Sequence, residues 1–286
     1  MNIYLINKRH FEIEKMKKLS IITICYNEPN LEETCNSIVN QTWQDFEWIV
    51  IDGGSNEETQ KIWDKYKYRI NKFISEPDNG RYNAMNKGIK LAKGKYLNFM
   101  NAGDSFFYDS VLENIFMGKD YNSGVLYGFE YWPDSCFILK LPEKLTKEFF
   151  IEETLRHQAC FIKKELFEAF GLYDENIQIS ADYEKWLNFI FNNVEFQRLP
   201  FIVDTFKFNG CSSDKKCLSI LSKEKYSIIN KYFSEYEIDN YIQQNKIIKL
   251  SFLEKIFSVK NTKTKIYKII TIFGKQIKIK GRLVDE

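Results

Sequence analysis

The sequence predicts an α/β fold in which a mostly parallel central sheet is flanked by helices and followed by a helical C-terminal extension. Short β-rich apolar runs alternate with segments of helical periodicity from Leu19 to Asp104. Such alternation is typical of parallel strands that are joined by helical crossovers. Turn-forming residues follow each apolar run, at the strand ends where ligands of α/β sheets usually bind.

The elements follow one another in a regular order. The run "LSIITICY" precedes "NLEETCNSIVNQ", whose apolar residues share one face of a helix. "FEWIVIDGGS" is followed by the helical pattern "EETQKIWDKYKY", and "KFISEPDNG" by "RYNAMNKGIKLAKG". A fourth strand, in "KYLNFMNAGD", closes the series. We therefore expect parallel strands with a helix in each connection.

Composition limits the class of protein. The chain has 286 residues, of which 44% are apolar, so it can bury the core of one large domain or of two closely packed ones. A net charge of +2 gives no strongly basic surface, which argues against a nucleic-acid partner. Six cysteines without a CxxC pair favour free thiols in a reducing compartment.

The sequence shows no membrane span. No apolar run reaches roughly 18 residues, and "MNIYLINKRHFEIEKMKK" is too polar for a signal peptide. From Lys260 to Arg282 the chain carries eight Lys or Arg and no acid, interleaved with Ile, Tyr and Phe. Such a segment suits an anionic lipid surface. We expect a cytoplasmic protein, with peripheral association at the inner face of the cytoplasmic membrane left open.

Polar or flexible residues follow each of the four strands. They are Tyr26–Glu28, Asp52–Ser55, Glu76–Gly80 and Asn101–Asp104. Ordinary turn chemistry explains any one of these segments, since Asp, Asn, Gly and Pro are common loop formers. Because all four lie at one edge of the expected sheet, together they indicate a ligand site.

Six motifs occur in order: "SIITICYNE", "WIVIDGGSNEET", "SEPDNGRYNAMNKGI", "YLNFMNAGD", "RHQACFIKKELF" and "ISADYEKW". In order and spacing they resemble the glycosyltransferase family 2 enzymes of bacterial surface-polysaccharide assembly, which have a GT-A fold. The resemblance covers Leu19 to Phe208. It implies an inverting transferase that uses a nucleotide-diphosphate sugar, most commonly UDP-linked, and a divalent Mn²⁺ or Mg²⁺.

The resemblance also divides the chain. Residues 1–18 form an N-terminal extension, 19–104 the nucleotide-sugar-binding half, and 105–210 the acceptor-binding half of the same GT-A domain. Residues 211–286 form a helical region with a basic amphipathic tail, where Lys, Ser, Ile and Tyr dominate the composition. A packing appendage is the simplest interpretation of that region.

The resemblance implies which residues bind the donor. They are Thr23, Tyr26, Glu28, Asp52, Asp78, Gly80, Arg81, Asn101, Ala102 and Gly103. In this interpretation Thr23, Glu28 and Asp52 hold the nucleoside, the first through nearby backbone. Arg81 either faces phosphate or is an ordinary exposed residue in the first turn of a helix. Asp78 also suits a helix cap.

Only Asp104 carries over as a metal ligand. The motif reads Asn101-Ala-Gly-Asp104 where the family commonly has Asp-x-Asp, and Asn83 stands where the family usually has Asp. A hard Mg²⁺ or Mn²⁺ that is bound mainly by diphosphate oxygens needs few protein carboxylates. One Asp at a strand end is therefore sufficient.

Asp182 is the predicted catalytic residue. It precedes the apolar run "WLNFIF", so it lies near a helix start, where an aspartate commonly caps the helix. The resemblance instead implies that Asp182 is the general base that deprotonates the acceptor hydroxyl, with Glu184 as the weaker candidate. His157 and Gln158 would contact metal, diphosphate or acceptor, although a satisfied core histidine is the other interpretation of His157.

The sequence therefore predicts a metal-dependent hexosyl- or N-acetylhexosaminyltransferase. Its acceptor would be a saccharide on a lipid carrier or on a lipopolysaccharide core, in lipopolysaccharide, capsule or O-antigen assembly. A non-catalytic carbohydrate- or membrane-binding module is one alternative. A sugar nucleotidyltransferase is another, but it needs a Gly-rich basic loop where this chain has "CYNEPN". No GxGxxG follows a strand, which argues against a dinucleotide oxidoreductase.

Overall fold

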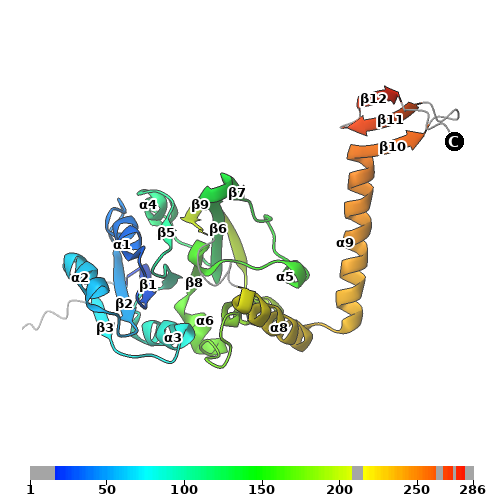
Figure 1. The fold of residues 1–286 in the computed structure, drawn as a ribbon. Helices are drawn as coiled ribbons and strands as arrows, with labels where there is room; N and C mark the ends of the chain where they lie inside the picture. Colours follow the sequence, from blue (N-terminus) through cyan, green and yellow to red (C-terminus); the bar gives the residue numbers. More distant parts are fainter. Residues whose placement is uncertain (1–16, 208–214, 262–266, 273–274, 281–286) are drawn as a thin grey trace, which may run out of the picture. The chain divides into compact units, whose positions relative to one another are not determined.

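Figure 1 shows a computed structural model of the protein, which describes residues 17–207, 215–261, 267–272 and 275–280. The chain divides into two compact units, Met1–Ile228 and Ile229–Glu286. The expected N-terminal extension, residues 1–18, lies outside the described residues except for its last two. The first unit contains a central sheet with helices on both faces, as the predicted α/β class requires.

One half of the sheet is parallel. Its order is β3-β2-β1-β4, formed by β1 (Leu19–Cys25), β2 (Phe46–Asp52), β3 (Lys72–Ser75) and β4 (Tyr96–Phe99). These are the four strands that the sequence predicts. All pairings among them are parallel, and β2 and β4 are buried along their whole length. Strands that are covered on both faces read as continuous apolar runs, which explains the sequence pattern.

The other half of the sheet is mixed. Its strands are β5 (Ser105–Phe106), β6 (Val125–Trp132), β7 (Phe137–Leu139), β8 (Cys160–Lys163) and β9 (Phe196–Thr205). Antiparallel β8 joins β4 to β6, and β9 runs parallel to β6. Short β5 and β7 pair antiparallel with β9 and β6. The predicted, mostly parallel sheet is confirmed, and each of its antiparallel pairs includes at least one strand of this half.

Helices cover the two faces of the sheet. The helices of the first unit are α1 (Leu31–Val39), α2 (Glu57–Tyr66), α3 (Arg81–Leu91), α4 (Val111–Phe116), α5 (Phe149–Glu152), α6 (Lys164–Phe170) and α7 (Ala181–Phe191). Side chains of α1, α2 and α4 share a core with Ile21 and Trp48. On the opposite face, α3 packs against Ile22 and α6 places Phe167 against Phe99.

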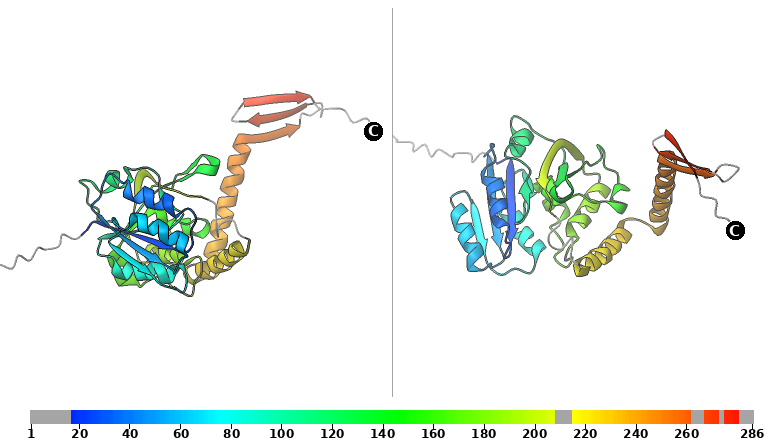
Figure 2. Two further views of the ribbon diagram at one scale, coloured as in Figure 1. Left: turned by 60° about the vertical axis from the view of Figure 1, so that its left-hand side comes forward. Right: turned by 45° about the horizontal axis from the view of Figure 1, so that its top comes forward.

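The C-terminal region begins with α8 (Lys215–Tyr232) and α9 (Glu235–Ile256). It then forms an antiparallel sheet of β10 (Phe257–Asn261), β11 (Tyr267–Ile272) and β12 (Lys275–Lys280), drawn in Figure 2. The region expected to be helical is therefore helical only as far as Ile256. "KQIKIK" alternates apolar and polar residues with a period of two, which favours a strand. Parts of the basic segment Lys260–Arg282 lie outside the described residues.

Two further expectations concern membranes and thiols. No helix in the described parts of the chain combines the length and the apolar character that crossing a bilayer requires. Cys25, Cys35, Cys136 and Cys160 are free thiols, as the sequence predicts. Cys217 is disulfide-bonded, so the prediction of free thiols is wrong for this cysteine.

Candidate active site

A cleft of about 1110 Å³ opens at the carboxyl ends of β1 and β4. The chain passes from β1 to β2 and β3 on one side and returns to β4 on the other, so loops diverge here. Most of the predicted site residues line this cleft, namely Tyr26, Glu28, Asp78, Gly80, Arg81, Asn101, Ala102, Gly103, Asp104, His157, Gln158 and Asp182. The structure thus brings residues from three strand ends together with two segments of the second half of the domain.

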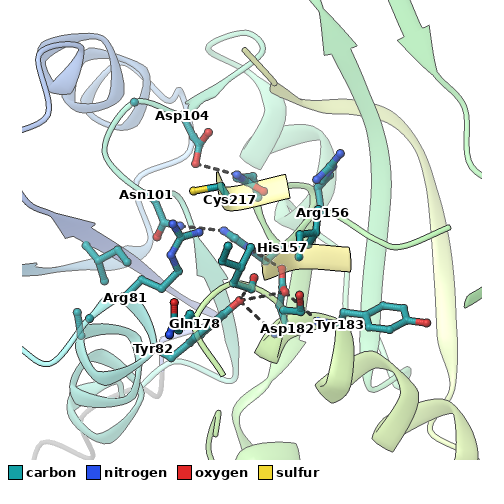
Figure 3. Close-up of a pocket in the computed structure, with 18 of the residues that line it drawn as sticks. Arg81, Tyr82, Asn101, Asp104, Arg156, His157, Gln178, Asp182, Tyr183 and Cys217 are labelled. Atoms are coloured by element: carbon teal, nitrogen blue, oxygen red, sulfur yellow. Dashed lines mark hydrogen bonds and ion pairs between the residues drawn. The ribbon is translucent and has the colours of Figure 1, made fainter. Parts of the chain in front are cut away.

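The loop between β3 and α3 forms part of the lining. Asp78 Oδ1 accepts a hydrogen bond from the backbone N–H of Gly80 at 2.9 Å. Gly80, directly before α3, has a φ of +109°, which glycine adopts without strain. A Cβ added at Gly53 would lie 2.8 Å from Asp78 Oδ2, so the two loops touch closely. Arg81 follows as the exposed first residue of α3 (Figure 3).

Asp104 lies just after β4, and its surroundings shift the pKa of its carboxyl group. Its Oδ2 accepts a hydrogen bond from Gln158 Nε2 at 2.8 Å. Burial raises the pKa of Asp104 to about 6, although His157 and Gln158 act in the opposite direction. The charge of Glu28 adds to the increase. A carboxylate in such a place gains stability when a cation approaches it.

His157 connects the strand-end loop to Asp182. Its Nε2 lies 2.8 Å from Asn101 Nδ2, and its Nδ1 lies 3.0 Å from Asp182 Oδ2 (Figure 3). Because an ionised carboxylate can only accept, Nδ1 is the donor in the contact with Asp182. The side chains of His157 and Asp182 are only 14% and 18% exposed, which shields this interaction from water.

Asp182 is the second residue of α7, since the cap position belongs to Ser180. Its Oδ1 accepts hydrogen bonds from the Tyr183 backbone N–H at 2.8 Å and from the Tyr82 hydroxyl at 3.1 Å. Burial alone would raise the pKa of Asp182. The hydrogen bond and charge of His157, assisted by Tyr183 and Tyr82, nevertheless hold that pKa below its ordinary value. Asp182 is therefore ionised at neutral pH.

Two predicted donor residues lie outside the lining of the cleft. Thr23 is fully buried, and its hydroxyl accepts a hydrogen bond from the Trp48 indole at 2.9 Å. Alternation along β1 directs Thr23 to the core face, together with Ile21. Asp52 is also fully buried, and its Oδ2 accepts hydrogen bonds from the Ser75 hydroxyl at 2.6 Å and from nearby groups. Its Oδ1 is buried without a hydrogen-bond partner.

The departure from the family pattern at Asn83 has a local explanation. Asn83 Nδ2 donates to Glu175 Oε2 at 2.8 Å, and Asn86 Nδ2 donates to Glu175 Oε1 at 2.8 Å. These hydrogen bonds, with that from Asn86 first, lower the pKa of Glu175. The amide of Asn83 therefore connects α3 to the loop before α7. An aspartate at this position would instead repel the carboxylate of Glu175.

The whole arrangement can be compared with known protein families. The family model described as "Glycosyl transferase family 2" matches residues 20–218, well over half of the chain. This chain belongs to glycosyltransferase family 2. The matched range of this family 2 member includes Asp104, His157 and Asp182, and the predicted family is thereby confirmed.

Curated relatives of this family 2 member have similar names. An uncharacterized glycosyltransferase of Methanocaldococcus jannaschii is 31% identical over 194 residues, which is 62% of this chain and 66% of that protein. A PGL/p-HBAD biosynthesis glycosyltransferase of Mycobacterium tuberculosis is 31% identical over 171 residues, 58% of this chain and 66% of that protein. The matches thus span slightly less than two thirds of the length of these relatives.

Solved structures share the fold. TarS of S. aureus in complex with UDP-GlcNAc has a TM-score of 0.60 at 17% identity, covering 78% of this chain and 70% of that one. The mannosyltransferase PcManGT of Pyrobaculum calidifontis, in complex with GDP-Man and Mn²⁺, has a TM-score of 0.53 at 16% identity, covering 66% and 56%. The GT-A fold that the sequence motifs imply for this family 2 member is confirmed.

Sequence reasoning missed a cluster of Arg156, Glu130 and Asp204 at the cleft of this family 2 member. Arg156 lines the cleft, with its Nε 3.9 Å from Glu130 Oε2 and its guanidinium 4.6 Å from the Phe206 ring centroid. Glu130 and Asp204 are fully buried partners on neighbouring β6 and β9. Burial raises the pKa of both carboxyls, and the charge of Glu130 adds to the increase at Asp204. The sequence signal that could have predicted this cluster is an acidic residue inside each of two largely apolar strands, Glu130 in β6 and Asp204 in β9.

Proposed function

We propose that this protein is an inverting glycosyltransferase that moves a sugar from a nucleotide-diphosphate donor to a hydroxyl group of a saccharide. One observation carries the proposal: Asp182 is held ionised in the same cleft as Asp104. The first carboxylate is suited to accept a proton, and the second to bind a cation beside a diphosphate. Membership of family 2 supports the same reaction class.

The donor that we propose is a UDP-sugar. S. aureus TarS, which has the same fold, was solved in complex with UDP and with UDP-GlcNAc. In this chain the ring of Tyr26 lines the cleft and is 68% exposed, which suits stacking on a base. The exposed guanidinium of Arg81 suits a phosphate group. The sugar itself would be a hexosyl or N-acetylhexosaminyl group.

The residues present fit a divalent Mn²⁺ or Mg²⁺ beside Asp104. The charge of Glu28 acts on the same carboxylate, whose pKa is raised by burial, so a cation would relieve both effects. Among the described residues no group of three or more acidic, His or Cys side chains could hold a metal ion, so diphosphate oxygens would complete the coordination. When bound, such a cation offsets the negative charge that grows on the leaving diphosphate.

Asp182 would accept the proton of the attacking hydroxyl. His157 donates to one carboxylate oxygen and Tyr82 to the other, so the group is oriented before the acceptor arrives. The acceptor oxygen bonds to the anomeric carbon as the bond to the diphosphate breaks on the opposite face, which inverts the configuration. Because the pKa of Asp182 is lowered, the proton moves late, after the attacking oxygen has gained positive charge.

For the acceptor we propose a saccharide on a lipid carrier or on a lipopolysaccharide core, in lipopolysaccharide, capsule or O-antigen assembly. The basic segment from Lys260 to Arg282 supports this choice, because it would attract the enzyme to anionic lipid. We accordingly propose a peripheral location at the inner face of the cytoplasmic membrane.

A panel of UDP- and GDP-sugars tests the proposed function. We expect slow hydrolysis of at least one UDP-sugar in the presence of Mn²⁺, with release of UDP and loss of the reaction in EDTA. Absence of both binding and hydrolysis across the panel would contradict the proposal and favour a non-catalytic binding module. Pyrophosphate release from UTP with a sugar phosphate would instead indicate a nucleotidyltransferase.

A further inference from the structure

Three consecutive backbone N–H groups converge on one carboxylate at the rim of the cleft. Glu224 Oε1 accepts from Gln178 at 2.7 Å, and its Oε2 accepts from Ile179 and from Ser180, both at 3.0 Å. Glu224 lies on α8, 44 positions or more along the chain from these residues. A carboxylate has enough lone pairs to accept several such bonds, and each is strengthened by its charge.

The three residues held by Glu224 lead directly into the helix of the proposed base. Ser180 is the N-cap residue of α7, and Asp182 is the second residue of that helix. Gln178, Ile179 and Ser180 all line the cleft, and Gln178 is labelled in Figure 3 beside Asp182. A shift of this backbone would therefore move the carboxylate of Asp182 relative to an acceptor in the cleft.

The N-cap side chain of α7 does not itself cap the helix, although Asp182 Oδ1 accepts a hydrogen bond from the Tyr183 backbone N–H within the first turn. The Ser180 side chain makes no cap hydrogen bond, and its hydroxyl oxygen is buried without a partner. The first backbone N–H groups of a helix lack intrahelical partners and carry partial positive charge. Glu224 supplies a negative charge next to that end, in place of a capping side chain.

A second contact fixes the same backbone from α3. The Tyr82 hydroxyl lies 2.5 Å from the Ile179 carbonyl oxygen and 3.1 Å from Asp182 Oδ1, so these two acceptors share its single proton. Ile179 is thus held at its N–H by Glu224 and at its carbonyl oxygen by Tyr82. Neither contact touches the proposed donor residues, so their effect should fall on the chemical step.

Lys225, the next residue of α8, also contacts the backbone of another segment that lines the cleft. Lys225 Nζ donates to the Glu152 carbonyl oxygen at 2.7 Å, and it lies 5.2 Å from the ring centroid of Tyr183. Both Glu224 and Lys225 lie beyond residue 218, where the match to the family model ends. This helix therefore takes part in building the cleft and is more than the packing appendage that composition suggests.

We propose that Glu224 is a positioning residue for Asp182. It fixes the backbone of residues 178–180, and through it the place and orientation of the general base. This role rests on the proposed function, since it concerns the rate of transfer from donor to acceptor. In physical terms, α8 completes the active site by supplying, among the described residues, the acceptor for the N–H groups of this loop.

Glu224→Gln is the primary variant. It keeps the size of the side chain but removes the charge, and it turns an –NH₂ group toward N–H donors. We expect transfer kcat to fall about 10- to 100-fold, because small misplacement of a catalytic group has effects of that order. UDP affinity with Mn²⁺ should stay at the wild-type value. Backbone amides of residues 178–180 should exchange hydrogen faster than in the wild type.

Lys223→Gln is the matched control, because it removes a charge from the exposed neighbouring position on α8. It should leave transfer and amide exchange unchanged. Glu224→Ala should show the same losses as Glu224→Gln, and a thermal melt of each variant verifies that it is folded. A folded Glu224→Gln variant with wild-type transfer and wild-type exchange would overturn the proposal. Equal losses of UDP binding and transfer would also overturn it, since they indicate a general structural role.

The double variant Asp182→Asn with Glu224→Gln separates this inference from the proposed function. If Glu224 acts through Asp182, the second substitution should add no further loss of transfer once Asp182 is replaced. An additional loss equal to that of Glu224→Gln alone would contradict the positioning role. Wild-type transfer by Asp182→Asn alone would instead overturn the base assignment, whereas the amide exchange would still report whether Glu224 holds the loop.

Discussion

Asp104 and Asp182 face the same cleft, yet their surroundings push their pKa values in opposite directions. Burial raises the pKa of Asp104 to about 6, with Gln158 as its hydrogen-bond donor. Asp182 is buried too, but His157 and Tyr82 hold its pKa below the ordinary value. Carboxylates whose pKa values are separated in this way can take different roles in one reaction. This difference supports the proposed roles, cation binding for Asp104 and proton acceptance for Asp182.

Asp104→Asn should abolish the tightening of UDP binding by Mn²⁺, because the substitution removes the carboxylate on which the cation depends. Calorimetry of UDP with and without Mn²⁺ measures this. Asp120→Asn is the control, since Asp120 is 82% exposed and lies outside the cleft lining. An undiminished Mn²⁺ effect in Asp104→Asn would remove Asp104 from the metal site.

The same substitution should stabilise the metal-free protein. The folded-state pKa of about 6 exceeds the ordinary value of 3.8, so the Asp104 contribution to stability is lost as pH rises through about 6. Asn carries no charge to bury. We therefore expect the free energy of unfolding of Asp104→Asn to be roughly 1 kcal/mol higher than that of the wild type at pH 7.5. This corresponds to a Tm that is about 2–4 °C higher. The difference should shrink at pH 5, and a lower Tm at both pH values would contradict the account.

His157→Phe should shift the acid limb of the transfer rate to higher pH. The wild-type limb reflects a pKa of Asp182 below 3.8, because His157 opposes the effect of burial. Without that hydrogen bond and charge, burial raises the pKa, and the base becomes protonated at higher pH. Tyr68→Phe is the control, since Tyr68 is exposed and lies outside the lining of the cleft. A limb that does not move in His157→Phe would show that His157 does not set this pKa.

The sequence predicted the residues that follow strands better than those whose role depends on a distant partner. Asp104 and Asp182 were predictable because each belongs to a motif at the end of a strand or the start of a helix. Tyr82 was missed because its partner Asp182 lies 100 residues away. The period of two along β1 directs the Thr23 side chain to the core, and the expected contact with the nucleoside through nearby backbone stays a prediction.

At the scale of elements, α3 connects the donor side of the cleft to the base. Its first residue is Arg81, and its residues Tyr82 and Asn86 contact the loop before α7. The helix approaches β1 so closely that a Cβ at Gly88 would lie 2.4 Å from Ile22 Cγ2. Only glycine therefore allows this helix to sit where both sets of contacts form.

Gly88→Ala should destabilise the protein by about 1–3 kcal/mol, because the added methyl group has no room against Ile22. The higher helix propensity of alanine offsets only about 1 kcal/mol. Thermal or denaturant unfolding measures the effect, with Lys90→Ala at an exposed position of the same helix as the control. A Gly88→Ala variant as stable as the wild type would show that α3 can move away from β1 without cost.

Local periodicity explains which elements were predictable. β1 to β4 and the helices between them appear as uninterrupted apolar or amphipathic patterns, so their order could be read from the sequence. The direction of β8 depends on pairing with β4 and β6, which local patterns do not encode. The C-terminal strands were not predicted, because the segment was interpreted from its basic charge alone. The alternation of apolar and polar residues in "KQIKIK" is the pattern that favours a strand.

At the scale of the whole molecule, all residues that line the cleft belong to the first unit. The second unit carries most of the excess of basic residues near the C-terminus. The proposed catalysis and the proposed membrane attachment should therefore be separable by truncation.

Deleting residues 260–286 should weaken binding to anionic vesicles, because basic residues close to such a surface contribute about 1 kcal/mol each. Co-sedimentation with anionic and with neutral vesicles measures the change, and added salt should weaken wild-type binding. UDP binding serves as the control, since the cleft lies in the first unit. Unchanged sedimentation of the truncated chain would contradict a role for this segment at membranes.

The central claim, that Asp182 is the base of a glycosyl transfer, is tested most directly by Asp182→Asn. With a donor and acceptor identified, transfer rate, UDP affinity with Mn²⁺ and thermal stability should be measured for the wild type, Asp182→Asn and the control Glu184→Gln. We expect a folded Asp182→Asn variant that binds UDP normally and transfers about 10²- to 10⁴-fold more slowly, with Glu184→Gln near the wild type. A folded Asp182→Asn variant that binds UDP and transfers within about threefold of the wild type would contradict the claim, because a lost general base costs far more than that.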